Sequence, residues 1–176
     1  MRPIVLTIGH STRTLDAFLD ALRAHGIQRV ADVRRFPASR RHPHFNREAL
    51  GPALARAGIE YEWLPALGGR RPPRPDSRNT RWRNSSFRGY ADYMETAEFQ
   101  DAIERLAAIA QRGATAVMCA EALWWRCHRS LIADYLTARG IAVAHITGAP
   151  QPEPHRYTEP ARIIDGKLSY TEDRLI

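Results

Sequence analysis

Short apolar runs alternate with amphipathic segments along most of the chain. The runs are typical of buried strands, whereas spacings such as Leu15, Phe18, Leu19 and Leu22 place apolar side chains on one face of a helix. This pattern predicts strands over residues 3–8, 27–33, 59–64, 114–120 and 141–146. It predicts helices over residues 14–26, 46–58, about 90–111 and about 126–139.

The order of these elements predicts how they assemble. Strands that alternate with helices pair in parallel and are covered by the helices, through right-handed crossovers. We therefore expect an α/β fold: a mainly parallel open sheet of about five strands with helices on both faces, in a Rossmann-like arrangement. A C-terminal β-hairpin is expected around Asp165-Gly166, a sequence suited to a type I′ turn. Because no internal repeat is found, residues 1–176 are interpreted as a single domain, with a core over 3–147 and a hairpin extension over 150–176.

One connection is much longer than the others. Residues 65–89 are rich in Gly, Pro, Arg, Asn and Ser. Most connections in compact domains are about 4–6 residues long. A loop of this length is expected to be either a mobile lid or a binding loop.

Positive charge is concentrated in one segment. Residues 34–88 hold 13 arginines, no lysine and 4 acids, a net charge of +9, whereas the whole chain carries +7. A basic surface favours anionic partners such as phosphates or nucleic acid. The alternative is a solvated face in a chain that uses arginine almost to the exclusion of lysine.

Composition excludes several classes of protein. No run of about 18 apolar residues is present, so a membrane span is not expected. The N-terminal residues lack the apolar core and cleavage site of a signal peptide and are interpreted as the first strand. Two cysteines are too few for a disulfide scaffold, which favours a reducing cytoplasm.

Polar residues follow the ends of the predicted strands. In open parallel sheets, ligands bind beyond the carboxyl ends of the strands. We therefore expect a pocket formed by the side chains that gather at this edge. These residues are Gly9, His10, Ser11, Arg34, Arg35, Phe36, Pro37, Ser39, Cys119, Glu121, Cys127, His128 and Arg129.

The two cysteines are the candidate reactive groups. Cys127 is expected in the first turn of a helix, where unpaired N–H groups favour a thiolate or a bound phosphate. Its two interpretations are a nucleophile and a small buried side chain. Cys119 ends a buried strand and is interpreted as a core residue, although a transient disulfide to Cys127 is conceivable. Their spacing matches neither a C-x-x-C redox motif nor the C-x5-R loop of cysteine phosphatases.

Glu121 and His10 are the candidate acid–base groups. Glu121 is interpreted as a general base, a ligand of a substrate hydroxyl, or an ion-pair partner of Arg129 or Arg34. His10 is interpreted as an acid–base group or phosphate contact, the alternative being a structural histidine.

Neither a metal nor a cofactor is expected. His42 and His44 alternate, but no set of zinc ligands has the usual spacing, and neighbouring Arg40 and Arg41 repel cations. Residues 68–90 combine arginines with aromatic side chains, a composition that favours nucleic acid; the alternative is a disordered loop. The candidate nucleic-acid contacts are Arg40, Arg41, Arg70, Arg71, Trp82 and Arg88.

Five stretches follow one another in an order found in a known family. They are "TIGHSTRTLDAFLDAL", "VADVRRFPASRRHPHFN", "YEWLPALGG", "FRGYADYM" and "CAEALWWRCHRSLIADYL". Together they closely resemble the domain of unknown function 488 family, and the C-x-E-x5-C-H-R element is the most specific mark. The resemblance implies a small cytoplasmic α/β protein without an established activity. The resemblance points by position to Gly9, His10, Ser11, Asp32, Arg34, Cys119, Glu121, Cys127, His128 and Arg129.

One turn departs from that family's pattern. Many relatives have Asp-Pro after the C-A-E element, where this chain has residues 122–125. Trp124 and Trp125, in this turn, are expected to cover the pocket or to pack on a neighbouring subunit.

The sequence supports three hypotheses for function. The first is an enzyme acting on an anionic, phosphate-bearing substrate, either a nucleotide or nucleic acid, with Arg34 and Arg129 holding the anion. The second is a nucleic-acid-binding module without catalysis. The third is a thiol redox sensor that uses Cys119 and Cys127.

Overall fold

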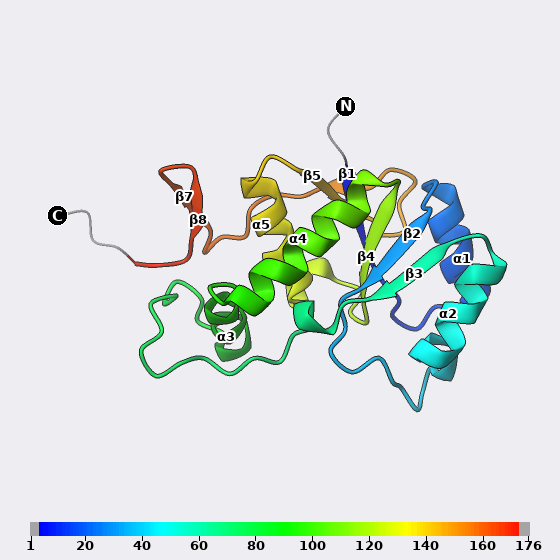
Figure 1. Ribbon diagram of the computed structural model, residues 1–176, viewed down its shortest axis with the longest axis horizontal. Helices are drawn as coiled ribbons and strands as arrows, with labels where there is room; N and C mark the ends of the chain where they lie inside the picture. Colours follow the sequence, from blue (N-terminus) through cyan, green and yellow to red (C-terminus); the bar gives the residue numbers. More distant parts are fainter. Residues whose placement is uncertain (1–3, 173–176) are drawn as a thin grey trace.

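The computed structural model describes residues 4–172 and confirms the predicted α/β fold. Its main sheet has the order β3-β2-β4-β1-β5-β6, and Figure 1 labels the strands from β3 to β5. The first five strands of this order are parallel, and β6 is antiparallel to β5. The strands are β1 (Ile4–Gly9), β2 (Arg29–Asp32), β3 (Glu60–Trp63), β4 (Thr115–Cys119), β5 (Ala142–His145) and β6 (Glu153–Pro154). The short β6 is the one strand of this sheet that the apolar pattern did not predict.

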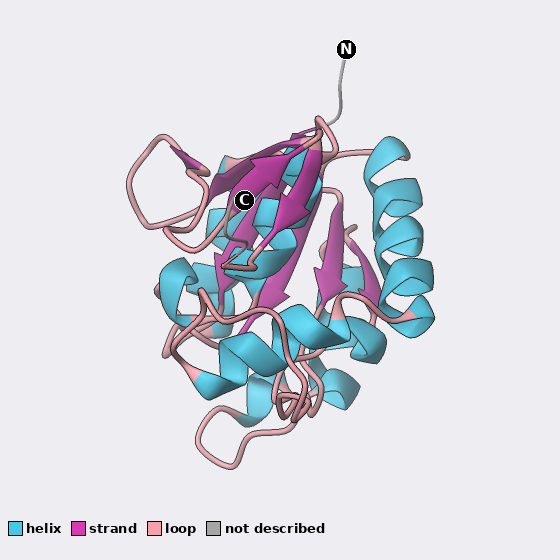
Figure 2. Cartoon of the chain, turned by 90° about the vertical axis from the view of Figure 1, so that its left-hand side faces the viewer, coloured by secondary structure: helices cyan, strands magenta, loops and turns pink. Residues whose placement is uncertain are grey.

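Within residues 4–172, five α-helices cover the two faces of the sheet (Figure 2). Their bounds are α1 (Leu15–Ala24), α2 (Arg47–Arg56), α3 (Ser85–Tyr93), α4 (Ala97–Gln111) and α5 (Arg129–Ala138). Apolar side chains of α1 and α2 pack in one core cluster, and those of α3, α4 and α5 pack in the other. The five parallel strands are therefore enclosed on both sides, as all-parallel sheets require.

Two predicted helix boundaries were wrong. The helix expected over about 90–111 is two helices, because Asn84 and Thr96 each cap a helix by accepting a backbone N–H three residues later. The helix expected from about 126 begins at Arg129. A 3-10 turn over Trp124–Arg126 precedes it, and Cys127 has extended backbone angles. Cys127 thus lies two residues before the helix and not in its first turn.

The long arginine-rich loop is tied to α3 through Asp92. The carboxylate of Asp92 accepts hydrogen bonds from the Arg74 backbone N–H at 2.8 Å, the Ser77 hydroxyl at 2.6 Å and the Asn79 amide at 2.7 Å. Burial raises the pKa of Asp92, but these hydrogen bonds outweigh it and hold the pKa below its usual value. The segment therefore has an internal anchor that its polar composition did not indicate.

The C-terminal hairpin is confirmed as a separate two-stranded sheet. Strands β7 (Arg162–Ile164) and β8 (Lys167–Ser169) are antiparallel, and both turn residues have positive φ, 51° at Asp165 and 77° at Gly166. This is the requirement of a type I′ turn. The Tyr170 hydroxyl donates to Asp134 of α5 at 2.8 Å, which ties the end of the hairpin to the body of the protein.

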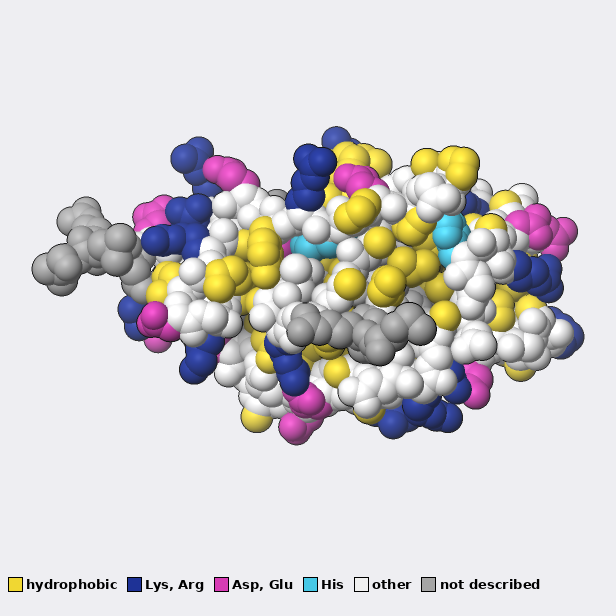
Figure 3. Space-filling model, turned by 90° about the horizontal axis from the view of Figure 1, so that it is seen from above, with side chains coloured by type: hydrophobic (Ala, Val, Ile, Leu, Met, Phe, Trp, Pro, Cys, Tyr) yellow, Lys and Arg dark blue, Asp and Glu magenta, His cyan; other side chains and the backbone are white. Residues whose placement is uncertain are grey.

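The face of the molecule at the start of β1 carries side chains of both charges. Figure 3 shows Lys and Arg side chains interspersed with Asp and Glu around this face. Among residues 4–172, none of the helices combines the length and the apolar character needed to cross a membrane.

Candidate functional site

A pocket of about 440 Å³ opens at the carboxyl ends of the strands, within the usual size range of small-molecule sites. Arginines dominate its charge: Arg34, Arg35, Arg70 and Arg126 line it, against the single carboxylate of Glu121. Its other lining residues are Phe36, Ala38, Gly69, Ser86, Phe87, Tyr90, Cys119, Ala120, Cys127 and His128. The pocket is therefore cationic and has the two thiols in its wall.

The two thiols are in contact. Cys119 and Cys127 are both free, and their Sγ atoms lie 2.8 Å apart. Cys119 is at the end of β4, and the turn through the Trp124–Arg126 segment brings Cys127 back beside it. Both side chains are buried, with exposed fractions of 2% and 7%. Sequence reasoning placed both residues at this edge and did not show that the sulfurs touch.

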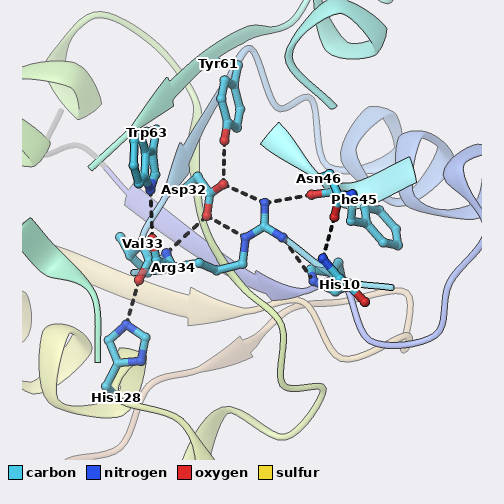
Figure 4. Close-up of polar contacts among 10 residues, drawn as sticks. His10, Asp32, Val33, Arg34, Phe45, Asn46, Tyr61, Trp63 and His128 are labelled. Atoms are coloured by element: carbon cyan, nitrogen blue, oxygen red, sulfur yellow. Dashed lines mark hydrogen bonds and ion pairs between the residues drawn. The ribbon is translucent and has the colours of Figure 1, made fainter. Parts of the chain in front are cut away.

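His128 has one ring nitrogen available to the thiol. Its Nε2 lies 2.8 Å from the backbone carbonyl of Val33, which can only accept, so Nε2 carries the proton (Figure 4). Burial lowers the pKa of His128, which favours the neutral ring. The unprotonated Nδ1 then faces Cys127 Sγ at 3.4 Å as an acceptor.

Arg129 places a buried positive charge behind the sulfurs. The residue is fully buried, and its guanidinium donates to Cys119 Sγ at 3.2 Å and to the Ala122 carbonyl at 3.1 Å. Within residues 4–172, no carboxylate forms an ion pair with it, and its Nε has no acceptor. A buried cation needs a compensating anion. The thiol pair, once it has lost a proton, is the nearest group that supplies one.

The two thiols differ in acidity. Burial raises the pKa of Cys127, but the hydrogen bond from Cys119 and the charge of Arg129 together outweigh this effect. The pKa of Cys127 is therefore below its usual value. Burial, followed by the neighbouring Cys127, raises the pKa of Cys119 well above its usual value. The first proton lost from the pair therefore leaves the thiolate on Cys127.

Gly9 allows β1 to pass closely under this site. A Cβ at this position would lie 1.8 Å from the Glu121 carbonyl oxygen and 2.9 Å from Arg129 Nη1. Any larger residue therefore displaces the turn that carries Glu121 or moves the buried guanidinium.

Replacing Gly9 with alanine is expected to destabilise the protein by about 1–3 kcal/mol, because backbone atoms must move to accept the methyl group. Urea unfolding measures this effect. Gly51→Ala is the matched control: its Cβ meets nothing closer than 3.5 Å, and alanine is the better helix former in α2. A Gly9→Ala protein as stable as the wild type would contradict the close approach.

Glu121 is exposed at the pocket mouth. Its Oε1 accepts the backbone N–H of Leu123 at 3.2 Å, so the carboxylate shapes the turn that follows. In the described part of the chain it forms no ion pair with Arg129 or Arg34, which was one of the expectations for it. The carboxylate remains accessible to a ligand in the pocket.

Arg34 belongs to a buried cluster at the end of β2 (Figure 4). Its guanidinium donates to both carboxylate oxygens of Asp32, at 2.8 and 2.7 Å, and to the Phe45 carbonyl at 2.9 Å. The Tyr61 hydroxyl donates to the same carboxylate. Arg34 thus lines the pocket with its hydrogen-bonding groups already engaged.

His10 lies in this cluster and outside the lining of the Cys127 pocket. Its ring stacks on Phe45 with 4.3 Å between centroids, Nδ1 contacts the Ser11 carbonyl at 2.9 Å, and Nε2 faces Arg34 at 3.4 Å. Burial lowers the pKa of His10 to about 4. Ser11 itself has a φ of 49° in the turn after β1, and its N–H donates to the Ala120 carbonyl.

The predicted nucleic-acid contacts have different surroundings in the structure. Arg70 lines the pocket, whereas Arg71 donates to the Gly68 carbonyl and lies 3.9 Å over the Tyr93 ring. Arg88 donates to the Trp82 carbonyl, and the Trp82 side chain is buried. The remaining two, Arg40 and Arg41, are exposed outside the pocket lining.

Metal ligands do not converge in the described structure. No group of three or more His, Cys, Asp or Glu side chains within residues 4–172 is arranged to hold a metal ion. His42 and His44, which alternate in the sequence, have ring centroids 6.0 Å apart and edge-on.

Two groups of residues were missed by sequence reasoning. Gly69 lets the backbone pass close to His128, since a Cβ there would lie 3.0 Å from Nδ1, and Tyr90 packs against the same ring at 5.2 Å. The Gly68-Gly69 pair was the available signal for this close approach. A second group, His145, His155 and Asp134, forms a buried hydrogen-bond chain with spacings of 2.8 Å, and its members lie too far apart in sequence to form a motif.

Comparison with known proteins identifies a family and no individual relative. The family model described as "Domain of unknown function DUF488" matches residues 14–136, more than half of the chain. Neither the curated proteins nor the solved structures include a match. The matched range contains both cysteines, His128 and Arg129. The chain therefore belongs to the DUF488 family.

Proposed function

We propose that this protein is an enzyme that uses the Cys127 thiolate as a nucleophile on an anionic, phosphate-bearing substrate. The observation that carries the proposal is the position of Cys127 Sγ in the wall of a cationic pocket, between Cys119 Sγ and His128 Nδ1. A nucleophile beside a base whose other nitrogen is held by a third group is the usual arrangement for covalent catalysis.

Each polar group around the thiol has a chemical role in this proposal. His128 Nδ1 accepts the thiol proton, and Arg129 stabilises the thiolate that remains. Attack forms a bond from Sγ to the electrophilic atom of the substrate and breaks the bond to its leaving group. The leaving group takes the proton from His128, and Glu121 activates the water that releases the second product.

Anion binding is assigned to the arginines at the mouth of the pocket. Arg35, Arg70 and Arg126 line it, and Arg70 and Arg126 are exposed. Arg34 contributes to the lining, but Asp32 compensates its charge. Because arginine presents several N–H donors in one plane, this set suits phosphate oxygens.

A second candidate function uses the same two thiols as a redox pair. The Sγ contact of 2.8 Å favours it, because the two sulfurs need to move little to reach the disulfide bond length of about 2.05 Å. With a peroxide as oxidant, the Cys127 thiolate attacks one oxygen and breaks the O–O bond to give a sulfenic acid; the Cys119 thiol then attacks this sulfur and releases water as the disulfide forms.

Alkylation of the native protein tests the thiolate and the anion site together. At pH 7 iodoacetamide is expected to modify Cys127 before Cys119, because a lowered pKa increases the thiolate fraction at a given pH. The rate should rise with pH to a plateau, with a midpoint below that of an ordinary thiol. Inorganic phosphate or a phosphate monoester should slow the reaction by occupying the pocket. Peptide mass spectrometry identifies the modified cysteine.

Three variants give this experiment its controls. Cys119→Ala removes the S–H group that donates to the thiolate and should shift the midpoint upward, whereas Cys127→Ser should leave the native protein unmodified. Arg56→Ala removes an exposed arginine far from the pocket and should leave phosphate protection unchanged. Modification of Cys119 first would contradict the proposal. Loss of both thiols after mild oxidation, with no effect of phosphate, would favour the redox pair instead.

A further inference from the structure

A second depression lies next to the Cys127 pocket, and five of its thirteen lining residues are aromatic. Its volume is about 760 Å³, and Phe87 of α3 lines both it and the Cys127 pocket. The Trp124–Arg126 turn, the end of the arginine-rich loop and the residues after β6 form its walls. We call this surface the aromatic groove; its aromatic members are Trp82, Phe87, Trp124, Trp125 and Tyr157.

Two of these rings are presented to solvent. Trp125 is 50% exposed and Tyr157 is 41% exposed, and both are among the few large hydrophobic side chains that the described surface leaves open. Trp125 contacts the buried Trp124 edge-on, with 5.7 Å between ring centroids. Exposed aromatic rings in a depression supply flat faces on which another ring can stack.

Arginine side chains line the same groove as the exposed rings. Arg83 and Arg156 line the groove and are exposed, and neither has an ion pair or hydrogen bond to another described residue. Arg81 also lines it but is held by the carbonyls of Pro160 and Glu159. Carboxylates line the groove as well, those of Glu159 and Glu172. The groove therefore offers two free guanidinium groups beside aromatic faces.

The ring of Trp124, which lines the groove, packs on a chain of buried hydrogen-bonded residues. Trp124 stacks face to face on His145, with 4.3 Å between centroids and 3° between ring planes. His145 contacts Thr7 at 2.6 Å on one side and His155 at 2.8 Å on the other, and His155 contacts Asp134 at 2.8 Å. This buried chain fixes the ring of Trp124, against which the exposed Trp125 rests.

Unused hydrogen-bond donors are also present in the walls. The indole N–H groups of Trp82 and Trp124 are buried and find no acceptor among the described residues. A buried donor without a partner lowers stability unless an acceptor from water or a ligand reaches it.

We propose that the aromatic groove binds single-stranded nucleic acid. Unpaired bases stack on aromatic side chains regardless of sequence, while arginines contact the phosphates between them, which is the combination that Trp125, Tyr157, Arg83 and Arg156 present. Duplex nucleic acid keeps its bases stacked inside and does not offer their faces. The inference uses residues outside the thiol site and does not require Cys127 to be a nucleophile.

Fluorescence anisotropy with a labelled oligothymidylate of about ten nucleotides tests the proposal at low salt. Wild-type protein is expected to bind it, and Trp125→Ala should weaken binding at least about tenfold. A double Arg83→Ala, Arg156→Ala variant should weaken binding and reduce its dependence on salt. Ile163→Ala removes an exposed apolar side chain from β7, outside the groove, and should bind as the wild type does.

Two further probes separate the alternatives. Inorganic polyphosphate carries the charge without bases, so equal binding of polyphosphate, unaffected by Trp125→Ala, would overturn the stacking proposal. Absence of oligonucleotide binding by the wild-type protein would overturn it as well. Cys127→Ser should retain full oligonucleotide binding, so a failure of the thiol proposal and a failure of this one are distinguishable.

Discussion

Replacing Asp32 with asparagine is expected to destabilise the protein by about 3–5 kcal/mol. The side chain of Asp32 is fully buried and makes two hydrogen bonds to Arg34, whose side chain is 8% exposed. Burial disfavours the charged guanidinium, but Asp32 outweighs it and holds the pKa of Arg34 above its usual value. The asparagine variant keeps the shape of the side chain and leaves this guanidinium charged, buried and unpaired.

Urea unfolding at pH 7.5 measures the effect, and an exposed pair provides the control. Glu62 receives two hydrogen bonds from Arg105, but the side chains are 36% and 52% exposed, so water screens the interaction. Glu62→Gln should therefore cost less than about 1 kcal/mol. If the two variants were equally stable, Asp32 would not be compensating a buried charge.

Acidification from pH 6.5 to about pH 4 is expected to lower the free energy of unfolding by several kcal/mol, before most exposed carboxylates become protonated. Burial lowers the pKa of His10 to about 4 and that of His145 to about 3, so both remain neutral in the folded protein. In the unfolded chain histidine binds a proton near pH 6.5. Between these values the unfolded state holds more protons than the folded state, so stability falls as pH falls. For His10 alone, the difference between its pKa in the unfolded and folded states lowers the free energy of unfolding by about 3 kcal/mol at pH 4.

A series of urea transitions between pH 7.5 and pH 4.5 tests this expectation. His145→Gln should be less stable than the wild type at pH 7.5, because it breaks the chain to Asp134, yet should lose less stability on acidification. His25→Gln replaces a histidine that lies outside both buried clusters and should leave the slope unchanged. A wild-type stability that is constant over this range would show that neither buried histidine is kept neutral by the fold.

Hydrophobic periodicity was enough to predict the architecture. Five apolar runs mark the five parallel strands, because a strand covered on both faces leaves few polar positions. The division between α3 and α4 was missed because no Gly or Pro interrupts residues 90–111, and the apolar face of Phe99, Ile103, Leu106 and Ile109 was extended back to Tyr90. Thr96 has the residue type of a helix cap, but its role depends on a backbone turn that periodicity does not detect.

Only part of the candidate site could be predicted in this way. The rule that ligands bind at the carboxyl ends of parallel strands brought Cys119, Glu121 and Cys127 to one edge. It did not show that the guanidinium of Arg34, in the pocket wall, is already engaged in a buried cluster, or that His10 lies in this cluster outside the pocket lining. That distinction depends on the ion pair with Asp32 and the stacking on Phe45, which are long-range packing details.

In both binding proposals, the anchoring of the arginine-rich segment at Asp92 bears on the entropy of association. The segment supplies Arg70 to the Cys127 pocket and Arg83 to the aromatic groove, and hydrogen bonds from Arg74, Ser77 and Asn79 to Asp92 hold it in the folded chain. A ligand that binds as proposed would lose its own translational freedom but would not have to immobilise a flexible stretch of chain, so the entropic cost would be lower than for a disordered loop. Selectivity between the proposed anions would then depend mainly on their dissociation rates.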